Sequence, residues 1–310
     1  MNKIRLKIIS DHISIGNQLL FTPFLRALKS QRPNSYITTN SKIMVQLTPE
    51  LFDNFDGKSA DTAIILIPNF FVALKNTLKY KKIIGFQYRI KGKFNGILLD
   101  TALKWNWSKH EIDNNRKFLP LFNLDDENYN LTLKPLFNLP KPKKLIGVHP
   151  GGRIDKRWSA EYFSKICDKL IASKYNVALF GGPEEIDLSK TVRKQMENEV
   201  YADYTGMTTL PGVISLINTC DFFFCNDGGL MHIASALKKP VAAIFGPTDY
   251  VKNGPYNDPH WIITNEIPCR PCYHFATIKC TNKNYYECLN ELKPDKVWNI
   301  LEQALKKANL

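Results

Sequence analysis

The segment DFFFCNDGGLMHIASALKKPVAAIFGP, residues 221–247, contains two short apolar runs, FFFC at 222–225 and VAAIF at 241–245. Both runs have the length of buried strands. Between them, GLMHIASALKK at 229–239 has the composition of a helix. A strand, a helix and a second strand in this order predict a right-handed β-α-β unit within a parallel sheet.

The same alternation continues through most of the 310 residues. Further strands are predicted in KIRLKIIS (3–10), TAIILIP (62–68), YKKIIGF (80–86), KLIGVHP (144–150) and YNVALFGG (175–182). A helix over 22–30 is predicted to begin at Pro23, and the proline- and lysine-rich segment 136–144 has the composition of a linker. We therefore predict an α/β protein with two doubly wound, Rossmann-like domains, residues 1–140 and 141–310.

Composition and charge restrict the class of protein. With 44% hydrophobic and 23% charged residues, the chain is typical of globular proteins. It has neither an apolar run of membrane-spanning length nor a signal-peptide pattern, so we expect a cytoplasmic protein. Residues 1–140 hold 20 Lys and Arg against 11 Asp and Glu, which indicates an anionic substrate or membrane surface, although solubility alone would also explain the excess. Because no nucleic-acid-binding motif is present, we expect no nucleic acid partner.

The joint CNDGG at 225–229 lies at the carboxyl end of a predicted strand, where open α/β sheets bind ligands. Gly228 and Gly229 permit a tight turn and close approach of a ligand. A helix starting at Asp227 or Gly228 would present free N–H groups to an anion such as phosphate, and His232 could add a hydrogen bond or a proton. The alternative is an aspartate cap, a glycine turn and a histidine that only packs.

Three further polar joints follow predicted strands, at HPGGRIDKRW (149–158), FGGPEEIDL (180–188) and YTGMTTL (204–210). They supply cations and amides for phosphates, a carboxylate at Glu184 or Glu185 for ribose hydroxyls, and a turn at Thr205 and Gly206 to line a base. The P-loop motif GxxxxGK[ST] is absent from the sequence. The pattern predicts a nucleotide site at one edge of the second sheet.

The segment CNDGGLMHIASALKKPVAAIFGPTD (225–249) resembles the hallmark segment of glycosyltransferase family 9, the bacterial heptosyltransferases of lipopolysaccharide core synthesis. Other motifs resemble the family in the expected order, namely SIGNQLLFTPFLRALK (14–29), IIGFQYR (83–89), HEIDNNRKFL (110–119) and HPGGRIDKRWSAEYF (149–163). The resemblance implies a GT-B fold, in which two Rossmann-like domains face each other across a cleft. The first domain would bind the acceptor and the second the donor, typically an ADP-activated heptose. The resemblance is also compatible with a C-terminal helix that packs back on the first domain.

The resemblance also assigns roles to single residues in the second domain. It places Lys156 near the donor phosphates and Glu184 at the ribose, and it assigns the pyrophosphate and the sugar to the loop with Asp227, Gly228, Gly229 and His232. A metal cofactor is not required for catalysis, because a helix N-terminus and Lys156 can stabilise the leaving diphosphate.

The amino-terminal motif departs from the family. The family's motif reads Ser-x-Gly-Asp, with the aspartate as proposed general base of an inverting displacement, whereas SIGN places Asn17 there. A carboxamide can orient the acceptor hydroxyl but cannot take its proton. The base could be Asp11 or His12, transfer could rely on leaving-group stabilisation, or the protein could bind without turnover. We favour an active enzyme because the donor motifs are complete, although Asp11 and His12 could be only a solvated loop pair.

Three basic residues, Arg89, Lys91 and Lys93, alternate after a predicted strand in YRIKGKF. They are candidates for binding the acidic sugars or phosphates of a lipid-linked acceptor, with the protein peripheral at the inner face of the cytoplasmic membrane. An exposed, solvated loop is the alternative.

Four of the seven cysteines cluster near the C-terminus: Cys269, Cys272, Cys280 and Cys288. Disulfides are not expected in the cytoplasm, and Cys-x2-Cys followed by two more cysteines predicts a structural zinc or iron site without an open position. Some family members carry cysteines in this region, and metal-bound examples are known among the heptosyltransferases that modify proteins. Four reduced thiols in a packed loop are the alternative.

Together these features predict an inverting glycosyltransferase that moves a heptose from an ADP-activated donor to a lipopolysaccharide or lipooligosaccharide core. One alternative is a family 9 relative that glycosylates a protein or another surface glycan. The other is a nucleotide-sugar-binding protein with weak or no turnover, because Asn17 replaces the family's base.

Overall fold

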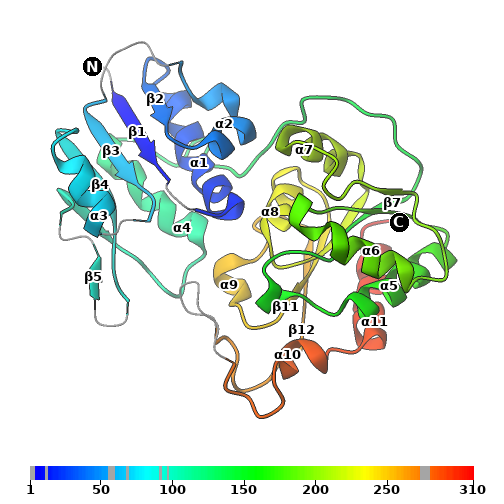
Figure 1. The fold of residues 1–310 in the computed structure, drawn as a ribbon. Coiled ribbons are helices and arrows are strands. Elements are labelled where there is room, and N and C mark those ends of the chain that lie inside the picture. Colours follow the sequence, from blue (N-terminus) through cyan, green and yellow to red (C-terminus); the bar gives the residue numbers. More distant parts are fainter. Residues whose placement is uncertain are drawn as a thin grey trace. The chain divides into compact units, whose positions relative to one another are not determined.

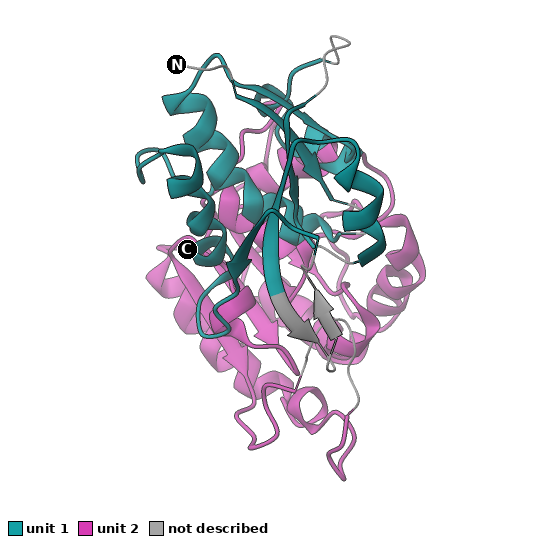
Figure 2. Cartoon of the chain, turned by 90° about the vertical axis from the view of Figure 1, so that its left-hand side faces the viewer, with its two compact units in different colours: residues 1–131 teal, residues 132–310 magenta. Residues whose placement is uncertain are grey.

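The computed structural model describes residues 4–10, 13–54, 60–67, 70–90, 93–95, 98–272 and 280–310. The chain divides into two compact units, residues 1–131 and 132–310 (Figure 2). The boundary lies before the predicted one at 140/141, because the residues after 131 bind to the second unit. Leu133 N–H donates to the Ala236 carbonyl at 2.9 Å, and the amides of Leu136 and Phe137 donate to Ser215 Oγ, each at 3.2 Å.

Unit 1 is built on a mostly parallel sheet. Its described strands are β1 (Arg5–Ile9), β2 (Tyr36–Thr39), β3 (Thr62–Ile65), β4 (Lys82–Ile90), β5 (Lys93–Asn95) and β6 (Thr101–Lys104). Its helices are α1 (Ile15–Gln31), α2 (Lys42–Leu47), α3 (Phe70–Thr77) and α4 (Glu111–Asn115), with 3₁₀ turns η1 (Pro49–Leu51) and η2 (Arg116–Phe122). The parallel strands have the order β2-β1-β3-β4-β6, and β5 pairs with the end of β4 as an antiparallel hairpin.

Helix α1 begins eight residues before Pro23, so the prediction that this proline starts the helix is wrong. Ser14 caps the helix, with Asn17 N–H donating to Ser14 Oγ at 3.4 Å. Pro23 has no N–H for the carbonyl of Leu19, and Thr22 Oγ1 donates to that carbonyl at 2.8 Å instead. The helix therefore continues through the proline without leaving this buried acceptor unsatisfied.

Aromatic side chains fix α1 against the sheet and against η2. The ring centroids of Phe21 and Phe118 are 5.4 Å apart, and those of Phe86 and Phe118 are 5.1 Å apart, both edge to face. Phe21 belongs to α1, Phe86 to β4 and Phe118 to η2. This packing holds the start of α1 close to α4, which directly precedes η2.

Unit 2 is built on a parallel sheet. Its strands are β7 (Leu145–His149), β8 (Asn176–Leu179), β9 (Ala202–Asp203), β10 (Phe222–Asn226), β11 (Val241–Phe245) and β12 (His260–Thr264). Its helices are α5 (Ala160–Ala172), α6 (Ile186–Lys194), α7 (Leu210–Thr219), α8 (Gly229–Ala236), α9 (Tyr250–Asn253), α10 (Glu287–Asn290) and α11 (Pro294–Lys307), with turns η3 (Ile154–Lys156) and η4 (Pro183–Glu185). The strand order is β12-β11-β10-β7-β8-β9, with the helices around the sheet (Figure 1). This is the doubly wound arrangement that the sequence predicts.

The core of unit 2 explains why its strands are continuously apolar. Every residue of β7, β10 and β11 is buried, since helices cover both faces of the sheet. Phe224 packs beside Phe163 of α5, with ring centroids 5.3 Å apart, and Trp158 Nε1 donates to the Leu292 carbonyl at 2.7 Å. The C-terminal helix α11 packs in this core through Val297, Leu301, Ala304 and Leu305.

Within the described ranges, no helix combines the length and the apolar character that crossing a bilayer requires.

Candidate functional site

The candidate site lies at the point in unit 2 where the strand order reverses. The chain leaves β7 for β8 on one side and later returns to β10 on the other side, so the loops after β7 and β10 diverge at the carboxyl edge of the sheet. Ligands of doubly wound proteins bind in this crevice. Asn226, at the end of β10, joins the two loops by donating to the carbonyls of Pro150 at 2.8 Å and Gly151 at 3.1 Å.

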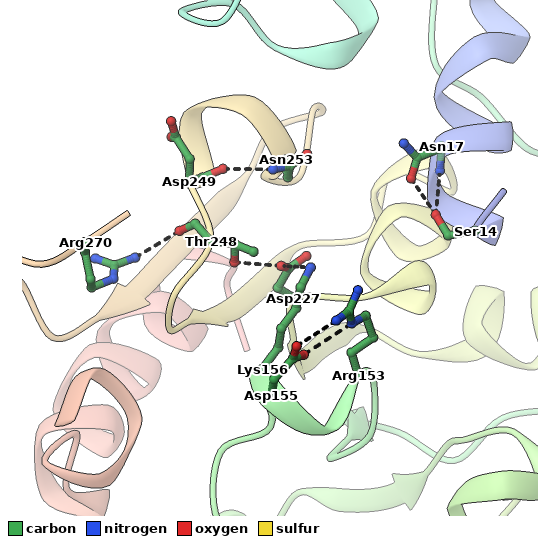
Figure 3. Close-up of polar contacts among 10 residues, drawn as sticks. All are labelled: Ser14, Asn17, Arg153, Asp155, Lys156, Asp227, Thr248, Asp249, Asn253 and Arg270. Carbon is green, nitrogen blue, oxygen red and sulfur yellow. Dashed lines mark hydrogen bonds and ion pairs between the residues drawn. The ribbon is translucent and has the colours of Figure 1, made fainter. Parts of the chain in front are cut away.

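Asp227, which is buried, and Lys156, which is partly buried, form an ion pair in this crevice (Figure 3). Lys156 Nζ lies 2.8 Å from Asp227 Oδ2, and the side chains are 14% and 4% exposed. Thr248 Oγ1, from the loop after β11, donates to the same carboxylate oxygen at 2.7 Å. Arg270 holds that loop by donating to the Thr248 carbonyl at 3.3 Å and to the Gly246 carbonyl. Two predicted donor-binding residues are thus in direct contact.

Helix α8 begins at Gly229, with Gly228 as its N-cap. The Asp227 carboxylate binds Lys156 and Thr248 and is therefore not a helix cap. Gly228 has an extended φ of −173°, and a β-carbon there would lie 3.7 Å from its nearest neighbour, His149 Cε1. Backbone conformation and packing would therefore both accept a side chain at this position. His232 is buried in the first turns of α8.

Glu185 is a structural carboxylate whose role the sequence left undecided. Its oxygens accept from the amides of Gly152 and Gly182, His149 Nε2 lies 3.0 Å away, and Arg157 lies 3.5 Å away. Burial alone would raise the pKa of Glu185. The hydrogen bond and charge of His149, together with the two amides, outweigh this effect and lower the pKa to about 2. Glu185 therefore ties the loop after β7 to the loop after β8.

Glu184, the predicted ribose ligand, is exposed at the start of η4. Its carboxylate covers Gly182, where a β-carbon would come within 2.5 Å of both carboxylate oxygens. In the loop after β9, Thr205 is buried, and Gly206, with a φ of +69°, donates its N–H to the Gly181 carbonyl at 3.0 Å. The loops after β8 and β9 are therefore adjacent, and Thr205 and Gly206 line a shallow pocket with Met207.

In unit 1, Asn17 lies in the first turn of α1. Its Oδ1 accepts from the Ser14 hydroxyl (Figure 3), and its Nδ2 donates to Glu111 Oε1 at 2.9 Å and Oε2 at 3.1 Å. Burial raises the pKa of Glu111 to about 7, and the hydrogen bond from Asn17 opposes this shift. No motif in the sequence marks Glu111 as a site residue. Asp11 and His12, the predicted substitute bases, lie outside the described residues.

The basic segment predicted to bind the acceptor is a β-hairpin, not a loop after a strand. Strand β4 extends to Ile90 and therefore includes Arg89, which pairs with Phe94 of β5. Lys93 pairs with Ile90, and Lys91 lies outside the described residues.

The four clustered cysteines differ in exposure. Cys288 is buried, Cys272 and Cys280 are partly buried, and Cys269 is exposed. Burial raises the pKa of Cys288 to about 11. Among the described residues, which exclude 273–279, no group of three or more His, Cys, Asp or Glu side chains could hold a metal ion.

Comparison with known proteins identifies the family. The model of glycosyltransferase family 9 (heptosyltransferase) matches residues 50–285. Lipooligosaccharide heptosyltransferase 2 of Campylobacter jejuni subsp. jejuni serotype O:2 is 24% identical, with 96% of this chain and 97% of the relative aligned.

Two solved structures show the fold. A glycosyl transferase of family 9 from Veillonella parvula superposes with a TM-score of 0.79 at 19% identity, covering 99% of each chain. The E. coli ADP-heptose lps heptosyltransferase II superposes with a TM-score of 0.67, also at 19% identity, covering 99% of this chain and 100% of the other. The two parallel-sheet units have the GT-B fold of these enzymes, and the chain belongs to glycosyltransferase family 9 (heptosyltransferase).

Proposed function

We propose that this glycosyltransferase transfers a heptose from an ADP-activated donor to a lipopolysaccharide or lipooligosaccharide core. The observation that carries the proposal is the alignment along nearly the whole chain with a lipooligosaccharide heptosyltransferase 2. The fold shared with an ADP-heptose lps heptosyltransferase supports the same donor. These relatives favour a core acceptor over a protein or another surface glycan, and transfer over binding without turnover.

The donor would bind at the switch point of unit 2. The N-terminus of α8, with Gly228 and Gly229, offers backbone amides and a positive dipole end to the diphosphate. Lys156 supplies a cation, and Asp227 holds its ammonium in place. His232 lies in the same helix, while Glu184 would bind the ribose and Thr205 with Gly206 would line the base.

In the proposed reaction, the acceptor hydroxyl attacks the anomeric carbon of the heptose with inversion. The bond from that carbon to the diphosphate oxygen breaks, and the leaving ADP takes the electron pair. Lys156 and the α8 amides stabilise the negative charge that develops on the diphosphate. The proposed transfer therefore uses no metal or organic cofactor.

Unit 1 would bind the acceptor. Its catalytic candidates from the sequence are Asn17, which can orient the acceptor hydroxyl, and Asp11 and His12. Arg89, Lys91 and Lys93 would bind anionic groups of a lipid-linked saccharide, with the protein working at the inner face of the cytoplasmic membrane.

Cys269, Cys272, Cys280 and Cys288 remain a proposed structural zinc or iron site. Elemental analysis of the purified protein tests this role. We expect close to one metal ion per chain, and loss of this ion in the Cys269→Ser/Cys272→Ser variant. Wild-type protein that contains no metal, and whose thermal stability the double substitution does not change, would contradict the metal site.

Calorimetric titration with ADP, UDP and GDP is the first test of the function. We expect ADP to bind most tightly of the three. Lys156→Ala should weaken binding of each nucleotide, because Lys156 would bind the diphosphate that they share, whereas Lys165→Ala, which removes an exposed lysine paired with Glu161, should leave binding unchanged. Turnover of ADP-heptose with a panel of truncated lipooligosaccharide cores then tests transfer. A preference for UDP or GDP would reject the ADP-heptose donor, and absence of nucleotide binding would reject the enzyme itself.

A further inference from the structure

We propose that Glu111 is the general base that takes the proton from the acceptor hydroxyl, with Asn17 as the residue that orients its carboxylate. The inference rests on the proposed function, because it assigns a catalytic residue to the same transfer. It concerns unit 1 alone and starts from the contact between the first turns of α1 and α4.

The Asn17 side chain is held in one orientation. Because its Oδ1 accepts from the Ser14 hydroxyl, its amide nitrogen points to Glu111, where it lies 2.9 Å and 3.1 Å from the two carboxylate oxygens. The amide has no basic atom, and the carboxylate has lone pairs that Asn17 does not occupy. Within this pair, only Glu111 can accept a proton.

Most other acidic side chains in the described part of unit 1 are held by cations or backbone amides. Glu50 pairs with Arg26, Asp53 with Lys29, Asp61 with Lys81 and Asp126 with Arg116, at distances of 2.6–3.0 Å. In the same described part, no ion pair joins Glu111 to a cation, and its described side-chain partner is a neutral amide. A carboxylate that is not neutralised keeps the basicity that proton transfer requires.

Several ionisable groups lie close to Glu111 in the sequence, at the start of α4 and on η2. On its own element, His110 Nδ1 accepts from the Ile112 amide, and Asp113 is the other acid. On η2, Arg116 pairs with Asp126, while Lys117 Nζ donates to the Lys104 carbonyl and to Asn114 Oδ1. Burial is the dominant influence on Glu111: it raises the pKa of the carboxyl to about 7, against the hydrogen bond from Asn17, and this value suits a base at neutral pH.

The step balances. The acceptor O–H proton moves to a Glu111 oxygen as the acceptor oxygen bonds to the anomeric carbon, and ADP leaves with the electron pair of the broken bond. Glu111 then returns its proton to water. The rate of transfer should fall tenfold per pH unit below about 7, because protonated Glu111 cannot act.

The test measures kcat and its pH profile for heptose transfer from ADP-heptose to truncated lipooligosaccharide cores. We expect Glu111→Gln to lower kcat about 100- to 1000-fold and to abolish the fall below pH 7, with ADP affinity unchanged. Glu127→Gln, which removes an exposed acid from the same unit, is the charge-matched control and should stay within about threefold of wild type.

A reciprocal variant separates catalysis from folding. Asn17→Asp/Glu111→Gln keeps an amide–carboxylate pair but moves the carboxylate to position 17, and we expect it to recover at least about tenfold of the lost kcat. A purely structural role would restore stability without this recovery of rate. Thermal unfolding of both variants shows whether unit 1 has folded.

Each remaining outcome rejects a specific statement. Glu111→Gln with wild-type kcat and pH profile would overturn the role of Glu111 while leaving the proposed transferase intact. Loss of the acidic limb in Asp11→Asn or His12→Ala, but not in Glu111→Gln, would assign the base to those residues. Absence of transfer by the wild-type protein, despite ADP binding, would reject the proposed function and with it a base for that reaction.

Discussion

Glu185→Gln tests whether one buried carboxylate holds the loops of the candidate donor site together. The Glu185 side chain is 7% exposed and accepts from the amides of Gly152 and Gly182, with His149 Nε2 at 3.0 Å. A glutamine has one acceptor oxygen in place of two. One of the amides would therefore face an N–H group, and Arg157, 3.5 Å away, would lose its counter-charge.

The shift in the pKa of Glu185 sets the size of the effect. A fall from the ordinary 4.5 to about 2 corresponds to about 3 kcal/mol of stability, at 1.36 kcal/mol per pKa unit. Because the folded-state pKa is lowered, this contribution is complete above pH 4.5 and is lost as the pH falls from about 4.5 towards about 2. At pH 4 about 1 kcal/mol of it has already disappeared.

Urea unfolding at pH 7 and pH 4, followed by tryptophan fluorescence, measures both quantities. We expect Glu185→Gln to lower the free energy of unfolding by about 3 kcal/mol at pH 7 and by about 1 kcal/mol less at pH 4. Glu184→Gln is the matched control: it removes the neighbouring exposed carboxylate and should change stability by less than about 0.5 kcal/mol. A loss below about 1 kcal/mol at pH 7, or the same loss at both pH values, would refute the reasoning.

Three further changes test other parts of the structure. Lys156→Ala should weaken ADP binding about 10- to 100-fold in calorimetry, because it removes a charged donor and leaves a carboxylate facing the phosphates; unchanged affinity would place the nucleotide elsewhere. Gly228→Ala should weaken ADP binding with little change in melting temperature. Gly152→Ala should instead lower the melting temperature, because Gly152 has a φ of +105° that L-residues disfavour. A lowered melting temperature and unchanged ADP affinity in Gly228→Ala would contradict the role given to Gly228. Thr22→Val should lower the free energy of unfolding in urea by about 1–2 kcal/mol, and by less in a Pro23→Ala background, where residue 23 regains its backbone N–H. Equal losses in both backgrounds would show that the Thr22 hydroxyl does not replace the N–H that Pro23 lacks.

Much of unit 2 could be predicted from the sequence because local signals agree there. Strands β7, β8, β10 and β11 are short apolar runs that end in glycine or polar residues, so both the parallel sheet and the edge that carries the site follow from the pattern. The same rule places Lys156 and Asp227 in loops at one edge of the sheet, and the structure adds their direct contact.

Other features depend on contacts that no local pattern specifies. Glu184 and Glu185 are adjacent acids at the same turn, and only the position of His149 and of two backbone amides decides which is buried. Pro23 is a strong local signal for a helix start, yet the buried face of α1 and the Thr22 hydroxyl override it. Likewise, the hairpin of β4 and β5 extends a strand through a basic segment that has the composition of a loop.

The pairing of Asn17 with Glu111 shows that the chemical groups present at a motif can come from another segment of the chain. The two residues are 94 positions apart: Asn17 is an amide in the first turn of α1, and Glu111 is an acid in the short helix α4. Packing of Phe21 and Phe118 brings the starts of α1 and α4 together, and it places a carboxylate within one hydrogen bond of the amide. Although position 17 is an asparagine, a carboxylate therefore lies beside it in the folded chain, because Glu111 of α4 supplies it.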